Sequence, residues 1–83
     1  MDNVFFETRN SDRNRKAGLV HKQVQLLGRR NGMVYFVTVP EQAYYGYCSE
    51  ALFGKEFTET KEAPEAPAPV PEDLSALPFQ KYQ

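Results

Sequence analysis

Cysteine, histidine and long apolar runs are all scarce in this sequence of 83 residues. The single cysteine, Cys48, excludes a disulfide within the chain, and with the one histidine, His21, it falls short of the four ligands of a Cys/His zinc site. No run approaches the ~20 apolar residues of a membrane span. The first residues lack the basic and apolar regions of a signal peptide. From these absences we expect a soluble, cytoplasmic protein without a metal, a cofactor or a membrane partner.

Proline is nearly absent from the first 60 residues, where Pro40 is the single example. The other prolines lie at positions 64, 67, 69, 71 and 78, in a segment rich in Pro, Ala and Glu. Repeated prolines neither pair in a sheet nor continue a helix, and they favour an extended polyproline conformation. We therefore expect one folded domain over residues 1–60 and a disordered tail over residues 61–83.

The densest run of β-branched and aromatic residues, 33–39, directly follows the Asn-Gly pair at positions 31 and 32. Side chains of these types suit a pleated, buried strand. Asn-Gly between apolar runs is a strong hairpin signal, because both residues tolerate the positive φ of a tight turn. We therefore predict a central strand over residues 33–39, joined by a turn over residues 28–32 to a strand over residues 19–27.

Three shorter segments complete the expected domain. An apolar run over residues 3–8 predicts a strand at a sheet edge, and residues 56–60 predict a second edge strand. Residues 9–18 are polar, rich in turn formers and without periodicity, which is typical of an exposed loop.

Residues 42–53 have a helical period, with apolar residues recurring at intervals of three and four. Thr38 and Glu41 have the spacing of a capping box, and Pro40 is tolerated in a first helical turn. Gly46 opposes the helix by about 1 kcal/mol relative to alanine. We predict a small α+β domain in β-β-β-α-(β) order, in which one helix covers a mostly antiparallel sheet of three or four strands. The alternative is an SH3-like barrel in which the helix shortens to a turn.

Positive charge is concentrated in the first half of the chain, although the formal net charge is −1. Residues 1–40 carry seven cations against three anions, a net of +4, and residues 41–83 carry three cations against eight carboxylates, a net of −5. A basic surface is typical of phosphate-backbone binding, and equally of a solvated face. The nucleic-acid-binding candidates are Arg9, Arg13, Arg15 and Lys16 in the loop and Arg29 and Arg30 in the turn.

Apolar residues reappear near the end of the tail, after the proline-rich spacer. Leu74, Leu77, Phe79 and Tyr82 predict either a docking peptide for a partner or a tail that packs on its own domain. Tyr45 lies at the edge of the helical apolar face and is a further contact candidate, because tyrosine is enriched at interfaces. These five residues are the candidates for protein binding.

A body of about 60 residues has little room to enclose a substrate. Cys48 on an apolar face is more typical of a small buried hydrophobe than of a nucleophile paired with His21. We therefore expect a non-catalytic adaptor or regulatory protein that binds another protein through its sheet–helix surface and its C-terminal motif. The alternative is a small nucleic-acid-binding protein that uses the basic hairpin and loop. A homodimer through an open sheet edge is compatible with either function.

Overall fold

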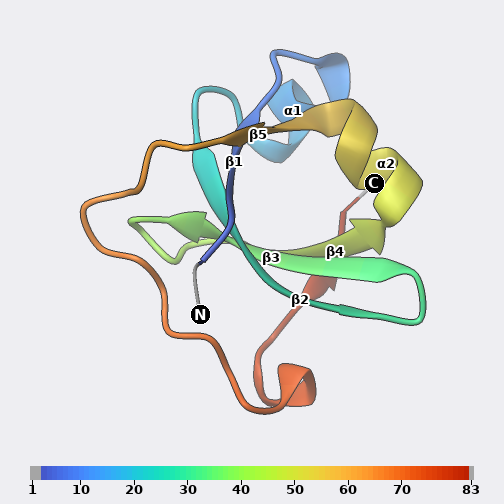
Figure 1. Cartoon of the computed structure of the whole chain (residues 1–83). Helices are drawn as coiled ribbons and strands as arrows, with labels where there is room; N and C mark the ends of the chain where they lie inside the picture. Colours follow the sequence, from blue (N-terminus) through green and yellow to red (C-terminus); the bar gives the residue numbers. More distant parts are fainter. Residues whose placement is uncertain (1–2, 83) are drawn as a thin grey trace.

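The computed structural model describes residues 3–82, which form a curled sheet of six strands with two short α-helices (Figure 1). In chain order the elements are β1 (Phe5–Thr8), α1 (Asp12–Ala17), β2 (Gln23–Arg30), β3 (Met33–Val39), β4 (Tyr45–Ser49), α2 (Glu50–Glu56), β5 (Phe57–Thr60), the 3-10 helix η1 (Leu74–Ala76) and β6 (Gln80–Lys81). The strands are ordered β5-β1-β2-β3-β4-β6, and only the β4–β6 pair is parallel in the described sheet. The predicted small α+β class is confirmed, but the sheet is larger than expected and mixed.

The β2–β3 hairpin agrees with its sequence signal. Asn31 and Gly32 have φ values of 51° and 76°, as a two-residue hairpin turn requires. β3 has the predicted bounds and lies inside the sheet between β2 and β4. The turn is shorter than the predicted residues 28–32, because β2 continues to the turn and contains a bulge between Leu26 and Gly28. Glycine in a strand is typical of such a bulge.

The predicted helix over residues 42–53 is wrong up to Ser49: residues 42–44 belong to the turn after β3, and Tyr45–Ser49 forms strand β4 paired with β3. Gly46 and Cys48 are buried while the residues between and beside them are more exposed, so the observed period is two. Helix α2 begins only after Ser49, whose hydroxyl accepts a hydrogen bond from the Leu52 N–H at 3.2 Å. Pairing with β3 therefore overrides the helical spacing of this segment.

Two predictions for the N-terminal region are also corrected. Residues 9–18 contain helix α1, which begins after its N-cap Ser11 and ends at Gly18 with φ 75°. A contact distant in sequence holds this short polar helix, because the buried Asn14 side chain donates a hydrogen bond to the Glu56 carbonyl at 3.0 Å. β1 is not an edge strand, since β5 pairs with it on the side away from β2, and β5 is the outer strand as predicted.

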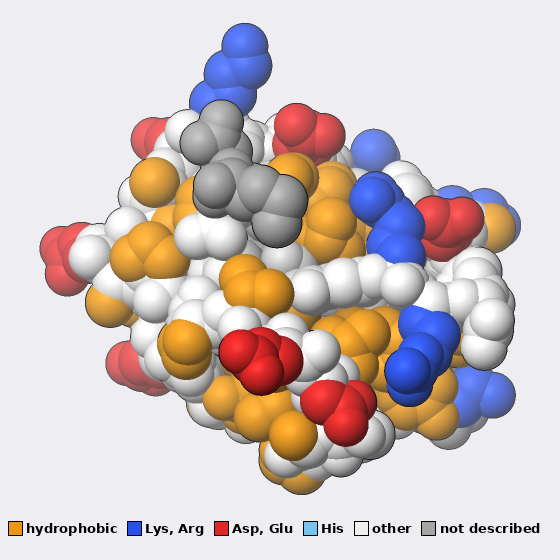
Figure 2. Space-filling view, turned by 60° about the horizontal axis from the view of Figure 1, so that its bottom comes forward, with side chains coloured by type: hydrophobic (Ala, Val, Ile, Leu, Met, Phe, Trp, Pro, Cys, Tyr) orange, Lys and Arg blue, Asp and Glu red, His pale blue; other side chains and the backbone are white. Residues whose placement is uncertain are grey.

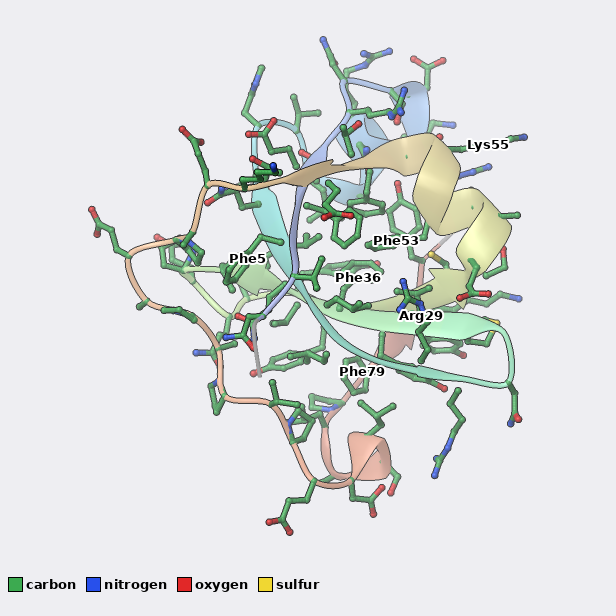
Figure 3. All side chains as sticks on the ribbon, viewed as in Figure 1. Phe5, Arg29, Phe36, Phe53, Lys55 and Phe79 are labelled. Carbon is green, nitrogen blue, oxygen red and sulfur yellow. The ribbon has the colours of Figure 1, made fainter. Side chains whose placement is uncertain are left out.

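Two apolar cores lie on opposite faces of the sheet (Figure 3). Neighbours such as Phe36 and Val37 belong to different cores, because successive side chains of a strand point to opposite faces. The first core consists of Leu19, Val24, Val34, Phe36, Cys48, Phe53, Phe57 and Tyr82. The second consists of Phe5, Leu27, Val37, Val39 and Ala68, with Tyr45, Leu74, Leu77 and Phe79 packed against it.

The sheet curls around the first core. The rings of Phe57, in outer strand β5, and Tyr82, next to outer strand β6, have centroids 5.4 Å apart. Among the strands of residues 3–82, β5 and β6 are not paired with each other. The sheet is thus curled without being closed by strand pairing into the barrel considered as the alternative.

The segment for which we expected disorder passes over the second face of the sheet, where Ala68, Leu74, Leu77 and Phe79 pack, and then forms β6 and places Tyr82 in the first core (Figure 1). Ala68 is buried there, and its backbone N–H and carbonyl make two 2.8 Å hydrogen bonds with the Gln25 side chain. The proline-rich composition says nothing about side-chain amides elsewhere in the chain that hold this segment. The tail packs on its own domain, which is one of the two alternatives that the sequence leaves open.

Candidate functional site

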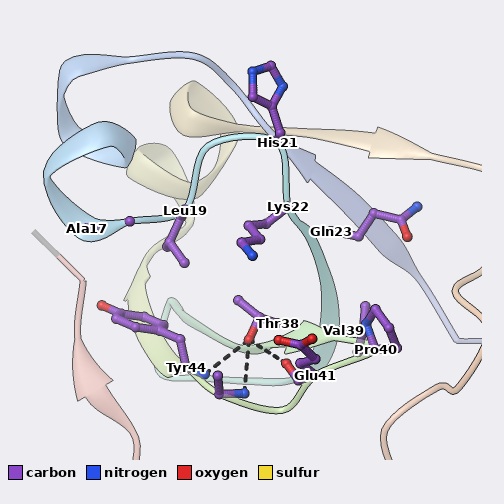
Figure 4. A pocket seen from close by; sticks show the side chains of 12 residues that line it. Ala17, Leu19, His21, Lys22, Gln23, Thr38, Val39, Pro40, Glu41 and Tyr44 are labelled. Carbon is purple, nitrogen blue, oxygen red and sulfur yellow. Dashed lines mark hydrogen bonds between the residues drawn. The ribbon is translucent and has the colours of Figure 1, made fainter.

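A cleft of about 540 Å³ opens between the segment that precedes β2 and the turn that joins β3 to β4 (Figure 4). It is lined by residues 17–19, 21–23, 38–41, 43 and 44. Pockets that bind small ligands typically measure about 300–1,000 Å³. The cleft is therefore large enough to take a small ligand or one or two side chains of a peptide.

One wall of the cleft is the turn after β3, and Thr38 holds its shape. The Thr38 hydroxyl accepts hydrogen bonds from the backbone N–H groups of Ala43 at 3.2 Å and Tyr44 at 3.0 Å. It donates one to the Glu41 carbonyl at 2.9 Å. A single buried side chain therefore bonds three backbone groups of the turn, in addition to the 2.8 Å hydrogen bond from the Ala43 N–H to the Glu41 carbonyl.

The other wall is the segment between α1 and β2. It turns sharply at Gly18 and at His21, whose φ values are 75° and 59°. Figure 4 shows that the His21 ring points away from the cleft, whereas Leu19 and Lys22 point into it. His21 is a non-glycine residue in the left-handed region, which is uncommon and is found where surrounding structure imposes it.

The interior of the cleft combines an apolar floor with two opposite charges. Leu19, Val39 and the ring of Tyr44 supply the floor, and Lys22 and Glu41 supply the charges. Burial, with a smaller contribution from Cys48, raises the pKa of Tyr44 above the ordinary value of a tyrosine. This lining suits an apolar side chain flanked by polar or charged groups.

The six basic residues predicted to bind nucleic acid do not form one surface in the described structure. Arg15 is ion-paired with Asp12, and Arg29 is paired with Glu50 with 3.0 Å between Nε and Oε1. The candidates in and just before α1 lie on a different side of the molecule from those beside the β2–β3 turn (Figure 1). The basic residues that we expected to bind one phosphate backbone are thus divided between two surfaces, and two of them are in ion pairs with carboxylates.

The five residues predicted to bind protein are in contact with the domain itself. Leu74, Leu77, Phe79 and Tyr45 pack on the second core. Tyr82 enters the first core, where it is 1% exposed and its hydroxyl donates a hydrogen bond to Asn14 Oδ1. The tail motif therefore already has a binding surface, which belongs to the same chain.

The structure does not bring Cys48 and His21 together as a nucleophile and base. Cys48 lies in the first core and is 1% exposed, whereas His21 is exposed at the rim of the cleft. Desolvation is the main cause that raises the pKa of the Cys48 thiol to about 11, while Arg13 lowers this pKa and Glu56 raises it to smaller extents. A thiol with this pKa is protonated at neutral pH and is a poor nucleophile.

Reasoning from the sequence did not identify the residues of the cleft as a site. Thr38, Pro40 and Glu41 have the spacing of a helix start, and Leu19 to Gln23 have the composition of part of a strand. Gly18 and Pro40 were the residues in the sequence that could have indicated the cleft, because each marks a break in regular structure next to a strand of the hairpin. That two such breaks face each other depends on the register between β2 and β3, in which Gln23 opposes Val39.

Comparison with known proteins gives no functional assignment, so any functional conclusion rests on the residues of the cleft and of the tail described above. The sequence matches no protein-family model, and neither the curated proteins nor the solved structures give a significant match. Within residues 3–82, no helix is long and apolar enough to cross a membrane. The same part of the chain contains no group of three or more His, Cys, Asp or Glu side chains placed to hold a metal ion.

Proposed function

We propose that this chain is a non-catalytic adaptor or regulatory protein that binds an extended segment of a partner protein in the cleft before β2. The observation that carries the proposal is the cleft itself, which has an apolar floor and one wall held by the hydrogen bonds of the Thr38 hydroxyl. A preformed cleft loses less conformational entropy on binding than one that must be ordered by its ligand. This favours a role in binding.

The lining indicates how such a segment binds. A bulky apolar side chain of the partner contacts Leu19, Val39 and Tyr44 on the floor. Burial of one such side chain contributes about 1.5–3 kcal/mol, which alone supports only weak and reversible association. Lys22 and Glu41 then meet charged groups that flank the anchor, and such pairs contribute more to orientation and specificity than to affinity.

Nucleic-acid binding by the basic residues is the alternative, and the geometry supports it less. A phosphate backbone binds most tightly to a continuous run of unpaired cations. Here the candidate arginines and Lys16 are divided between two sides of the molecule, and two of the arginines are in ion pairs. A cytoplasmic location and a homodimer through an outer strand remain predictions.

The proposal is tested by selecting binders from a displayed random-peptide library and measuring their affinity for variants of the cleft. Ala43 is exposed and lines the cleft, so Ala43→Arg places a long charged side chain in it without removing a core contact. We expect the selected peptides to carry a bulky apolar anchor and to bind Ala43→Arg at least about tenfold more weakly, a loss of about 1.4 kcal/mol.

Ala51→Arg is the matched control, because Ala51 is also exposed but lies on α2, outside the cleft. It makes the same change of charge and size, and we expect it to leave the affinity unchanged. Failure to select any peptide, or equal binding by the two variants, would contradict the proposal.

A further inference from the structure

The end of the tail occupies a surface on the second face of the sheet. Phe79 packs edge-on against Tyr35 and Tyr45, with ring centroids 5.0 and 5.8 Å away. Leu74 lies over Gly28, where a Cβ would be 3.2 Å from Leu74 Cδ1, so the glycine backbone provides room for this leucine. These contacts place bulky apolar side chains of the tail on complementary positions of the domain.

The tail backbone is bound as an added strand. β6 runs parallel to β4, with Gly46 opposite Gln80 and Tyr47 opposite Lys81. The Tyr82 N–H then donates to the Tyr47 carbonyl at 2.9 Å. Strand addition to a sheet edge combined with pockets for side chains is a common mode of peptide recognition, in which the backbone gives affinity and the pockets give specificity.

The connection to this bound segment is extended and largely exposed. Between residues 61 and 73, most side chains are exposed, including Val70 at 52%. The tail follows β5 in the chain, and its described residues take no part in the strand pairs among β5, β1, β2, β3 and β4. Figure 1 shows the segment passing around the outside of the sheet before it reaches β6.

We propose that the surface under residues 74–82 is a binding site for an extended, largely uncharged peptide with the side-chain chemistry of this tail, which occupies the site in cis. The recognised ligand carries bulky apolar residues with the spacing of Leu74, Leu77, Phe79 and Tyr82. The lining is apolar: Leu74, Leu77 and Phe79 pack on the second core, which includes Phe5, Leu27, Val37 and Val39, and Tyr82 enters the first core beside Phe36 and Phe57.

This site shares Val39 with the cleft but is otherwise formed by different residues, and the inference does not rest on the function proposed for the cleft. The face of the molecule that includes the tail carries hydrophobic groups interspersed with acidic and basic side chains (Figure 2).

A partner peptide binds after the tail leaves, so the tail acts as a competing ligand at a high effective concentration.

The test uses the full chain with a protease recognition sequence inserted after the exposed Ala66, cleaved once the protein has folded. A fluorescently labelled synthetic peptide of residues 67–83 is then added, and its binding is followed by anisotropy. We expect the labelled peptide to replace the cleaved fragment saturably. We expect the uncleaved chain to bind it at least about tenfold more weakly, because its tail competes in cis.

Two altered peptides test which side chains are recognised. Replacement of Leu77 and Phe79 by serine should weaken binding by at least about tenfold, because both pack on the second core. Replacement of Val70 by serine should leave binding unchanged, because Val70 is exposed. Equal binding of the two altered peptides would overturn the proposal.

A full-length variant that carries both Leu77→Ser and Phe79→Ser provides a test that requires no cleavage. Because the altered tail competes less well for the site, this variant should bind the labelled wild-type peptide at least about tenfold more tightly than the unaltered full-length chain does. Circular dichroism shows whether the variant and the cleaved chain stay folded. If either protein unfolds, or if it stays folded and does not bind the peptide, the tail is an integral part of the domain and the proposal fails.

Discussion

Gly46 lies in β4 where two aromatic rings approach the backbone. A Cβ at this position would be 2.5 Å from Tyr44 Cε1 and 2.7 Å from Phe36 Cζ. Phe36 is fully buried and has little freedom to move away. We expect Gly46→Ala to lower the free energy of unfolding by about 1–3 kcal/mol through overpacking, as measured by urea denaturation.

Gly54→Ala is the matched control for this prediction. Gly54 lies in α2, and among the described residues no heavy atom outside its own helix backbone would lie within 4 Å of a Cβ added there. Alanine in a helix is more stable than glycine by about 0.5–1 kcal/mol, so this variant should be slightly stabilised. If Gly46→Ala is as stable as Gly54→Ala, the rings do not require a glycine in β4.

The turn between β3 and β4 depends on the Thr38 hydroxyl and not on a helical cap. Thr38→Val keeps the shape of the side chain but leaves the N–H groups of Ala43 and Tyr44 and the Glu41 carbonyl without this partner. We expect a loss of about 1–3 kcal/mol in the free energy of unfolding. Faster amide exchange at Ala43 and Tyr44 should accompany the loss.

Thr58→Val makes the same substitution on the exposed face of β5. Exposed substitutions of this kind usually change stability by less than about 0.5 kcal/mol. Comparable losses in Thr38→Val and Thr58→Val would show that the hydroxyl is not what holds the turn.

The C-terminal tail is joined to helix α1 by the contact between Tyr82 and Asn14. Asn14 is fully buried, and its Oδ1 accepts the hydrogen bond of the Tyr82 hydroxyl. Tyr82→Phe keeps the ring in the first core but removes this donor. We expect a loss of about 1–3 kcal/mol in the free energy of unfolding, the cost of an unpaired buried acceptor, and a denaturation midpoint shifted to lower urea.

Tyr45→Phe is the comparison for this whole-chain contact. The Tyr45 hydroxyl donates to Gln42 Oε1 at 3.1 Å in an exposed position, where water can replace the partner. Its removal should therefore change stability by less than about 0.5 kcal/mol. A Tyr82→Phe variant as stable as Tyr45→Phe would contradict the importance assigned to the Asn14 contact.

The sequence by itself determined the parts of this protein whose signals are local. Asn31 and Gly32 predict the hairpin turn, because both tolerate positive φ. The run over residues 33–39 predicts an interior strand, because its side chains suit burial on both faces. The class of the fold and the outer strand β5 are predictable for the same reason: each depends on a few consecutive residues.

Only the tertiary structure decided whether residues 42–49 form a helix or a strand, where the tail lies, and which residues line the cleft. The spacing from Thr38 to Glu41 is the same in a helix cap and in a turn. Pairing with β3 makes the segment at Gly46 a strand, where the rings of Phe36 and Tyr44 leave no room for a Cβ. The Gln25 amide holds Ala68, which is 43 residues away in sequence. Contacts between such distant segments contribute free energies comparable to local preferences, and no local pattern encodes them.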